Sequence, residues 1–263
     1  MQILIIGFGS TGKHLAQLAI GAGHNVWVTT RNKEYFSEIQ TAGAIPVLFG
    51  DPLPNKLTHI LTTAPPHEGK DPFLQQYSLE LPHTLKWLGY YSTTGVYGDA
   101  QGEWVDENSP LNAKNRRALA RISCEKDYRS AKSPLAILRL SGIYSNERNV
   151  IQRLKEGCQT LPDDAGPICR IHVDDIANLT LRLMEKTMTG TFNISDDAPS
   201  SSRSTVLAAC KKLNISPDTL EKSSSMSKGF GGEGFRRVSN KKIKHALKVE
   251  LKHPSFEAFL NEY

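Results

Sequence analysis

The sequence predicts an α/β protein built on a doubly wound parallel sheet. Short apolar segments rich in β-branched residues alternate with segments whose apolar residues recur at helical spacing, an order that requires right-handed crossovers between parallel strands. The first segment leads through a glycine-rich turn into a helix. With 263 residues and 39% hydrophobic residues, the chain is long enough for a full core and a smaller second domain.

The first strand is expected over residues 2–6, where Gln2-Ile-Leu-Ile-Ile6 is apolar enough to be buried on both faces. Glycines at G-x-G-x-x-G spacing follow, and apolar residues from Leu15 to Ala19 continue as a helix. In a dinucleotide site, the first glycine permits a tight turn, the second a close approach of a pyrophosphate, and the third close helix packing. The alternative is a plain glycine-rich turn. The predicted cofactor-binding residues here are Gly7, Phe8, Gly9, Ser10, Thr11 and Gly12.

A second strand is expected over residues 25–30, followed by Arg31 and Asn32. An NAD-preferring site places an acidic residue about twenty residues past the glycines to bind the ribose hydroxyls, and this chain has none there. A guanidinium instead matches a 2′-phosphate with two parallel hydrogen bonds. Arg31 with Asn32 therefore favours NADP, with NAD as the alternative, although Arg31 is also compatible with an ordinary surface loop.

Two more strands precede the middle of the chain, and each ends in candidate ligand-binding residues. Asp51 follows the strand expected over residues 45–49, and either accepts a hydrogen bond from an adenine amino group or serves the turn. Ala64 and Pro65 follow the strand expected over 57–63 and form a rigid wall suited to a flat ring. Helices are expected between these strands, over residues 35–42 and 71–81.

The remaining elements are regular at first and then less so. Strands are expected at 87–92, 135–140 and 191–194, and helices at 113–131 and 149–157. Residues 170–175 are expected to be a strand end, with Asp174 and Asp175 as an acidic N-cap for a helix that runs to about residue 186, before two or three further helices. Residues 223–234 are predicted to be a mobile loop because they are rich in Ser and Gly. These patterns predict a nucleotide-binding domain over 1–144 and a smaller α/β substrate-side domain over 145–263, with 168–195 returning to the main sheet.

Composition limits the classes of function. No apolar run approaches the ~20 residues that a membrane crossing needs, and no leader is visible, so a cytoplasmic protein without membrane contact is expected. The four cysteines lack metal-site spacing. The net charge of +5 is concentrated in residues 113–132. Because only Tyr128 interleaves these basic residues, nucleic-acid binding is not expected, and phosphates of a cofactor or substrate explain the charge better.

Four motifs in order resemble the extended short-chain dehydrogenase/reductase superfamily, and more narrowly its atypical branch of NAD-dependent epimerase/dehydratase-like proteins. They are the glycine-rich turn, Ser92-Thr-Thr-Gly-Val-Tyr-Gly98, Arg139-Leu-Ser-Gly-Ile-Tyr144 and Ile171-His-Val-Asp-Asp175. The resemblance implies a Rossmann-type fold, an NAD(P) cofactor, oxidoreductase or isomerase chemistry on a substrate such as a nucleotide sugar, and pairing into a homodimer.

The resemblance also implies a catalytic Ser/Thr with a Tyr and a Lys on one helix. Thr93 matches the Ser/Thr position, but Arg117 and Arg121 occupy the Tyr and Lys positions if Glu125 matches the glutamate that usually follows. A guanidinium gives up no proton at neutral pH, so Arg117 is expected to bind a substrate anion and Arg121 the cofactor's ribose or phosphates. Tyr97 is a substitute proton donor, although packing beside the nicotinamide is its expected role.

A literal Tyr-x-x-x-Lys pattern occurs at Tyr128 and Lys132. It begins eleven residues after Arg117, about 16 Å further along a helix, and is interpreted as coincidence. His172 is expected to be a structural histidine rather than a base. Two functions follow: an NADP-dependent oxidoreductase or epimerase acting on a small anionic substrate, or a cofactor-binding sensor or scaffold that has lost catalysis.

Overall fold

The computed structural model describes residues 1–77, 81–131, 133–157, 160–223 and 234–263. Within these ranges the chain forms two compact units, each assembled from separate segments. Unit 1 comprises residues 1–93, 115–139 and 176–192, and unit 2 comprises residues 94–114, 140–175 and 193–263. In this division unit 2 begins at residue 94 and the chain returns to unit 1 at residues 115 and 176. The sequence prediction has a boundary at residue 144 and a return of residues 168–195 to the main sheet.

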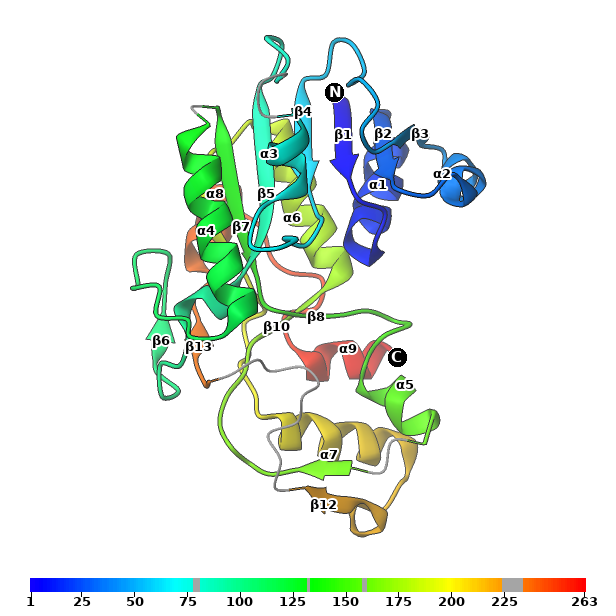
Figure 1. The fold of residues 1–263 in the computed structure, drawn as a ribbon. Coiled ribbons are helices and arrows are strands. Elements are labelled where there is room, and N and C mark those ends of the chain that lie inside the picture. The colour runs from blue at the N-terminus through cyan, green and yellow to red at the C-terminus, as the bar shows by residue number, and fades with distance from the viewer. Residues whose placement is uncertain (78–80, 132, 158–159, 224–233) are drawn as a thin grey trace. The chain divides into compact units, whose positions relative to one another are not determined.

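A seven-stranded sheet forms the centre of the fold, in the order β11-β7-β5-β4-β1-β2-β3 (Figure 1). The pairings that join β5 to β4, β4 to β1, β1 to β2 and β2 to β3 are all parallel. The bounds of these strands are β1 Gln2–Ile6, β2 Asn25–Thr30, β3 Ile45–Leu48, β4 His59–Thr62, β5 Trp87–Thr93, β7 Leu135–Leu140 and β11 Gly190–Ile194. The predicted doubly wound α/β fold is confirmed.

The chain order in this sheet reverses at β1. From β1 the chain moves outwards to β2 and β3, and then returns to add β4 and β5 on the other side. In open parallel sheets the crevice at such a switch point is where ligands bind, beyond the carboxyl ends of the strands. The glycine-rich turn follows β1, so it lies at that point.

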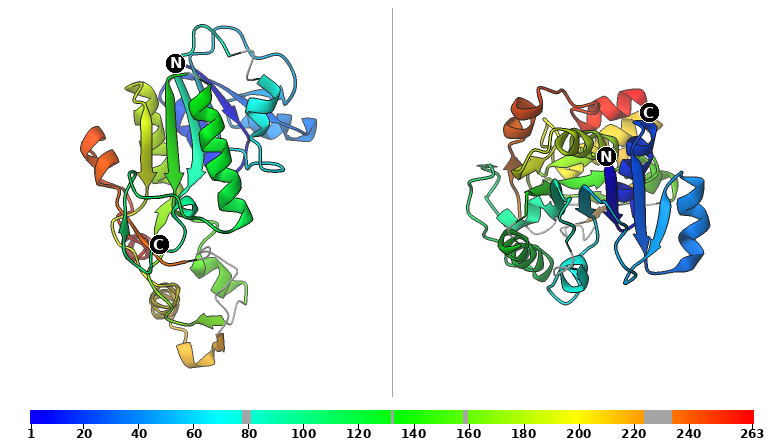
Figure 2. Two further views of the ribbon diagram at one scale, coloured as in Figure 1. Left: turned by 60° about the vertical axis from the view of Figure 1, so that its left-hand side comes forward. Right: turned by 90° about the horizontal axis from the view of Figure 1, so that it is seen from above.

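Helices cover both faces of this sheet, with α4 and α6 on opposite sides (Figure 2). The expected helix over 113–131 begins later, at Arg116, because the Asn115 side chain accepts a hydrogen bond from the Ala118 amide at 2.9 Å and caps it. The expected helix over 71–81 is described only as far as Tyr77. The helices are α1 Ser10–Gly21, α2 Phe36–Thr41 after the 3₁₀ turn η1 Lys33–Tyr35, α3 Pro72–Tyr77, α4 Arg116–Ser130 and α6 Val173–Glu185.

Unit 2 combines short parallel strand pairs with small helices. The pairs are β6 Trp104–Val105 with β13 Arg237–Val238, β8 Gly142–Tyr144 with β10 Arg170–His172, and β9 Thr160–Pro162 with β12 Glu221–Ser223. The helices are α5 Val150–Lys155, α7 Ser202–Leu213, α8 Lys241–Leu247 and α9 Phe256–Glu262, with 3₁₀ turns η2 Thr94–Tyr97 and η3 Pro217–Thr219. β10 pairs with β8, whereas β11 joins the main sheet.

Three sequence predictions need comment at this level. The sequence predicts that Asp174 and Asp175 cap α6. The structure instead places both residues within the first turn of the helix, because the helix already begins at Val173. The loop predicted over 223–234 falls almost entirely on residues 224–233, outside the described residues. No helix among the described residues is both long and apolar enough to cross a membrane.

Candidate functional site

The three glycines after β1 have three different surroundings. Gly7 has a φ of +104°, and a Cβ there would lie 2.9 Å from Oγ1 of Thr63. A Cβ on Gly12 would lie 2.4 Å from the carbonyl oxygen of Gly7, so only glycine lets α1 pack this closely. A Cβ on Gly9 would meet nothing within 4 Å. Packing within the fold explains Gly7 and Gly12 but leaves open space beside Gly9.

The start of α1 is suited to an anion. Gly9 occupies the N-cap position without a side-chain cap, and no acidic residue lies in the first turn. The first amide N–H groups of a helix have no partner within the helix, and they carry the positive end of its dipole. A phosphate placed beside Gly9 would therefore be bound by amides that this sequence does not cap.

A cavity of about 360 Å³ opens beside this turn in unit 1, which is within the usual size range of ligand sites. Of the predicted cofactor residues, Gly7, Phe8, Gly9, Thr11, Arg31, Ala64 and Pro65 line it. The sequence analysis missed several lining residues at the ends of neighbouring strands, namely Thr29, Thr30, Phe49, Thr63 and His67. A general signal was available, since residues at the carboxyl ends of adjacent parallel strands share one edge of the sheet.

Five predicted cofactor residues are not among those that line the cavity, and one of them, Arg121, is described below. Ser10 is exposed, and Gly12 is buried beneath the turn. Asn32 accepts a hydrogen bond from the Glu34 amide at 3.0 Å and thereby caps η1. Asp51 is exposed beside its bridge to Phe49. The turn interpretation of Asp51 fits this position better than the adenine interpretation.

Arg31 lies over an aromatic ring at the edge of the cavity. Its guanidinium carbon is 5.7 Å from the ring centroid of Phe49, and both residues line the cavity. Arg31 is exposed, so its charge remains hydrated and accessible to a ligand. Of the pair Arg31 and Asn32, which favours NADP in the sequence, Arg31 lines the cavity and Asn32 does not.

Arg121, also predicted to bind the cofactor, is held at the ends of β4 and β5. Its Nη1 donates to the carbonyl oxygen of Tyr91 at 2.6 Å, to the hydroxyl of Tyr90 at 3.0 Å and to the carbonyl oxygen of Ala64 at 3.4 Å. Within the described ranges every hydrogen bond of Arg121 uses Nη1, which leaves the Nε and Nη2 donors for a ligand. Because Ala64 lines the cavity, Arg121 lies at its margin.

Arg117 lies one turn earlier on α4 and is exposed. It forms no hydrogen bond or ion pair with the part of the chain that the structure describes, so its guanidinium is available to an external anion. Thr93, the predicted Ser/Thr of the site, is half-buried at the end of β5. The catalytic roles of Thr93, Arg117 and Arg121 stay predictions.

A buried ion pair fixes α4 against the sheet. The Arg139 side chain on β7 donates to both carboxylate oxygens of Glu125, at 3.1 and 2.8 Å, and the Ser92 hydroxyl on β5 donates to the same carboxylate at 2.6 Å. Glu125 and Arg139 are 2% and 3% exposed. Glu125 therefore sets the position of the helix that carries Arg117 and Arg121, a role the sequence analysis did not assign.

The two candidate tyrosines are both buried. In unit 2, the hydroxyl of Tyr97 donates to Oδ1 of Asn193 at 2.6 Å, and the side chain is 2% exposed, so its use as a proton donor requires this hydrogen bond to break. In unit 1, the hydroxyl of Tyr128 lies 2.7 Å from Oγ1 of Thr62 and 2.9 Å from Oδ1 of Asp71. Burial raises the pKa of Tyr128 well above its usual value, which fits the interpretation of its Tyr-x-x-x-Lys pattern as coincidence. Lys132 lies outside the described residues.

Unit 2 has a cavity of its own, which is lined by residues from β8, β10, α5, α7 and α9. The buried hydroxyl of Tyr144 lines it and makes no hydrogen bond to the described residues. Arg170 also lines it, and its Nη1 donates to the carbonyl oxygen of Ser200 at 3.0 Å. Nearby, burial raises the pKa of Asp196 to about 8. Two arginines, Arg153 and Arg170, therefore line this cavity together with Tyr144, other polar residues and several apolar side chains.

Comparison with known proteins identifies solved structures that share this fold. No protein-family model matches the chain, and neither does any curated protein. A solved structure of a conserved protein of unknown function from Silicibacter pomeroyi is 29% identical, with a TM-score of 0.89 over 98% of this chain and 96% of that one. A human epimerase-family protein with NADPH is 15% identical, with a TM-score of 0.77 over 100% and 98% of the two chains. A UDP-glucuronic acid 4-epimerase from Bacillus cereus with NAD is 18% identical, with a TM-score of 0.75 over 99% and 96%.

The chain thus has the fold of the NAD-dependent epimerase/dehydratase-like and atypical short-chain dehydrogenase/reductase proteins. The resemblance carried by the four sequence motifs is confirmed at the level of the fold. At these identities the nucleotide-bound neighbours establish the architecture, and the ligands in their structures bear on this chain only as support for a proposal.

Proposed function

We propose that the protein is a nicotinamide-dinucleotide-binding enzyme of the epimerase/dehydratase-like class. The observation that carries this proposal is the open space beside Gly9 at the uncapped start of α1, in a turn where Gly7 and Gly12 are fixed by packing. The cofactor's diphosphate fits there, against the helix N-terminus. The complexes of structural neighbours with NAD or NADPH support a nicotinamide cofactor.

NADP is the preferred cofactor in this proposal, with NAD as the alternative. Arg31 supplies a bidentate donor for a 2′-phosphate at the edge of the cavity, and no carboxylate stands at the end of β2 to bind free ribose hydroxyls. The Phe49 ring beneath Arg31 adds an apolar surface for the adenosine end.

The substrate is proposed to be a small anion, such as a nucleotide sugar. When bound, the nicotinamide accepts or donates a hydride. Arg117 binds the anionic group of the substrate, Arg121 holds the cofactor through its Nε and Nη2 donors, and Thr93 polarises the substrate oxygen. Arg117 cannot move a proton at neutral pH, so the proton must come from another group, for which Tyr97 remains the candidate.

Turnover by the purified full-length chain tests this proposal. With a panel of nucleotide sugars, we expect substrate-dependent cofactor oxidation when NADPH is supplied, or a substrate isomer when NADP⁺ is supplied. Arg117→Gln is expected to lower kcat/KM about tenfold to a hundredfold, as loss of a charge-assisted hydrogen bond does. Lys126→Gln, which removes another exposed cation of α4, is the matched control and should leave kcat/KM unchanged.

The second candidate function is a cofactor-binding sensor without catalysis. It is favoured by the arginine at the usual tyrosine position and by the buried hydrogen bond of Tyr97. Cofactor binding without turnover of any substrate in the panel would favour this candidate. Turnover that is equal in the wild type and in Arg117→Gln would contradict the role proposed for Arg117.

A further inference from the structure

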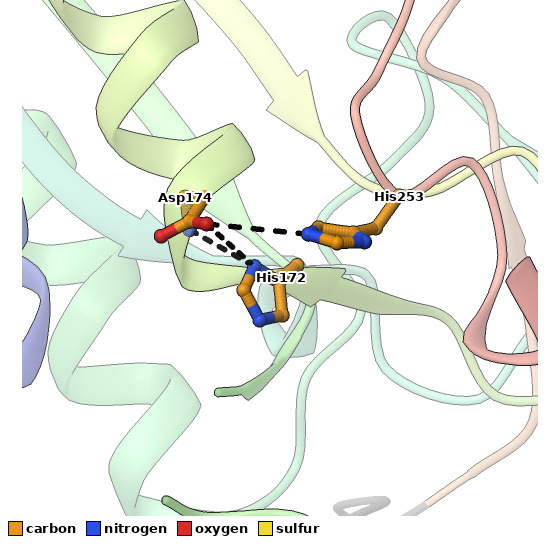
Figure 3. Close-up of side chains that lie close together, drawn as sticks. All are labelled: His172, Asp174 and His253. Carbon is orange, nitrogen blue, oxygen red and sulfur yellow. Dashed lines mark hydrogen bonds and ion pairs between the residues drawn. The ribbon is translucent and has the colours of Figure 1, made fainter. Parts of the chain in front are cut away.

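Two buried histidines and a carboxylate converge in unit 2, and none of them is among the residues proposed above to bind the cofactor. His172 ends β10, Asp174 lies in the first turn of α6, and His253 lies in the segment before α9 (Figure 3). The histidines are 1% and 3% exposed. Oδ2 of Asp174 is 3.7 Å from Nδ1 of His172 and 4.0 Å from Nε2 of His253, and one ligand atom from each residue lies within 4.8 Å of the others.

The atoms that face one another are all electron-pair donors. Nδ1 of His172 accepts a hydrogen bond from the Asp174 amide at 3.2 Å, so its ring proton is on Nε2. Nδ1 of His253 lies 3.4 Å from Oε2 of Glu262, and Nε2 of the same ring faces Asp174. Two imidazole nitrogens and a carboxylate oxygen therefore come together, and an ion that binds them displaces the Asp174 amide from Nδ1 of His172.

We propose that His172, Asp174 and His253 bind a divalent metal ion of the zinc class. Imidazole nitrogen with carboxylate oxygen is a ligand set that Zn²⁺ accepts, at about 2.0–2.2 Å from each atom. Tetrahedral coordination at that radius brings the ligand atoms to about 3.3 Å from one another. The separations of 3.7 and 4.0 Å from Oδ2 of Asp174 close to that value with a small shift of this side chain, which is 29% exposed. The two histidine nitrogens lie within 4.8 Å of each other, so the imidazole rings also move together when the ion binds.

An ammonium already stands at the carboxylate. Nζ of Lys252 lies 2.8 Å from Oδ2 of Asp174, and its side chain is 57% exposed. The metal therefore competes with Lys252 for Asp174, and the lysine side chain moves into solvent when the ion binds. With both rings neutral, two histidines, one carboxylate and a divalent ion leave a net charge of +1, and a water fills the fourth position.

The surroundings hold the ligands in place before any ion binds. The carboxylate of Asp175 accepts the amide N–H groups of Lys252 and His253 at 2.7 and 3.0 Å, and thereby fixes the segment that carries His253. Glu262 lies behind the His253 ring in the position of the carboxylate that orients many metal-bound histidines. The rings of Tyr144 and Phe259 pack on His172, with centroids 5.1 and 5.3 Å away. The ion joins β10, α6 and the segment before α9.

Titration of the chelator-treated full-length chain with ZnSO₄, followed by calorimetry, tests the proposal, with Co²⁺ absorption in the visible range as a second readout. We expect one ion per chain in the wild type. His253→Gln should weaken binding at least about a hundredfold, and Glu262→Gln about tenfold to a hundredfold. Lys252→Met should bind the ion more tightly, because it removes the competing ammonium. His245→Ala, at an exposed position of α8, is the control and should bind like the wild type.

Absence of stoichiometric binding in the wild type would overturn the proposal, and so would equal binding by the wild type and His253→Gln, which would indicate adventitious binding at surface histidines. Circular dichroism checks that each variant is folded. If His253→Gln does not fold, Lys252→Met decides: tighter binding than in the wild type supports the site, and unchanged binding overturns it. The outcome is independent of cofactor binding, because no residue of this cluster lines the cavity beside Gly9.

Discussion

At the scale of single residues, packing explains two glycines of the glycine-rich turn and does not explain the third. Gly7 and Gly12 are required by the fold itself, through a positive φ and a close approach of backbone to backbone. Gly9 has an extended conformation, with a φ of −74°, and no neighbour that excludes a side chain. The fold therefore does not require glycine at residue 9, whereas the proposed diphosphate site does.

Gly9→Ala tests this distinction. The substitution should change the free energy of unfolding by no more than about 0.5 kcal/mol, because the added methyl group meets nothing. It should weaken NADPH binding at least about tenfold, because the methyl group occupies space next to the helix amides. Gly21→Ala is the matched control, at the other end of α1, where a Cβ also meets nothing. Equal cofactor affinities for the two variants would contradict a diphosphate site at Gly9.

The sequence could predict the residues whose role is local. The glycine spacing and Arg31 depend only on a strand that leads into a turn, and the structure places them on one cavity. It could not predict that Asn32 caps η1, because Asn occurs both in caps and in ligand sites. Phe49 and Thr63 were missed because they meet the cavity only once β1, β2, β3 and β4 are adjacent.

At the scale of the element, α4 is the helix on which the proposed function depends. It carries Arg117 and Arg121, and the buried pair of Glu125 and Arg139 fixes it to β7. The sequence carried a signal for this pair that the analysis did not use, since Arg139 is a charged residue within the apolar strand Leu135–Leu140. A buried strand with a charge predicts a buried partner, but sequence alone does not identify it.

Glu125→Gln is expected to lower the free energy of unfolding by about 3 kcal/mol, because the buried guanidinium of Arg139 loses its counter-charge. Lys126→Gln, the exposed neighbour on α4, should change it by no more than about 0.5 kcal/mol. Urea unfolding of both variants measures the difference. A loss in Glu125→Gln as small as that in the control would show that the pair contributes little to the attachment of α4.

At the scale of the whole molecule, each unit gathers segments that are far apart in the sequence. Residues 94–114 leave unit 1 after β5, and the chain returns to unit 1 at residue 115. The loss of strand–helix regularity after residue 144 indicated a second unit but not this earlier excursion. The assignment of residues 94–114 to unit 2 depends on long-range pairings such as that of β6 with β13. The sequence does not reveal these pairings, because strands of two residues give no detectable periodicity.

The stability of the chain should fall in mild acid because of His59. Burial lowers the pKa of this histidine from 6.5 to about 4, and its ring lies between the Thr58 hydroxyl at 2.8 Å and the Met184 carbonyl at 3.1 Å. Below pH 6.5 the unfolded chain takes up a proton that the native state does not, so the free energy of unfolding decreases as the pH falls from 6.5 towards 4.

Between pH 6.5 and 4, His59 lowers the free energy of unfolding by on the order of 3 kcal/mol. Urea unfolding at several pH values measures it in the wild type and in His59→Gln, which has no group that titrates there. The variant should lose less stability than the wild type over the same window. Identical pH dependence in the two proteins would contradict a buried, neutral His59.

Thermal unfolding with NADP, NADPH, NAD and NADH, each titrated separately, tests the central claim most directly. A ligand that binds only the native state at a hundred times its Kd adds about 2.7 kcal/mol of stability. We expect a rise in Tm that is larger with NADP and NADPH than with NAD and NADH, and expect Arg31→Ala to remove the difference. No shift with any of the four would contradict a nicotinamide-dinucleotide site in the cavity beside Gly9.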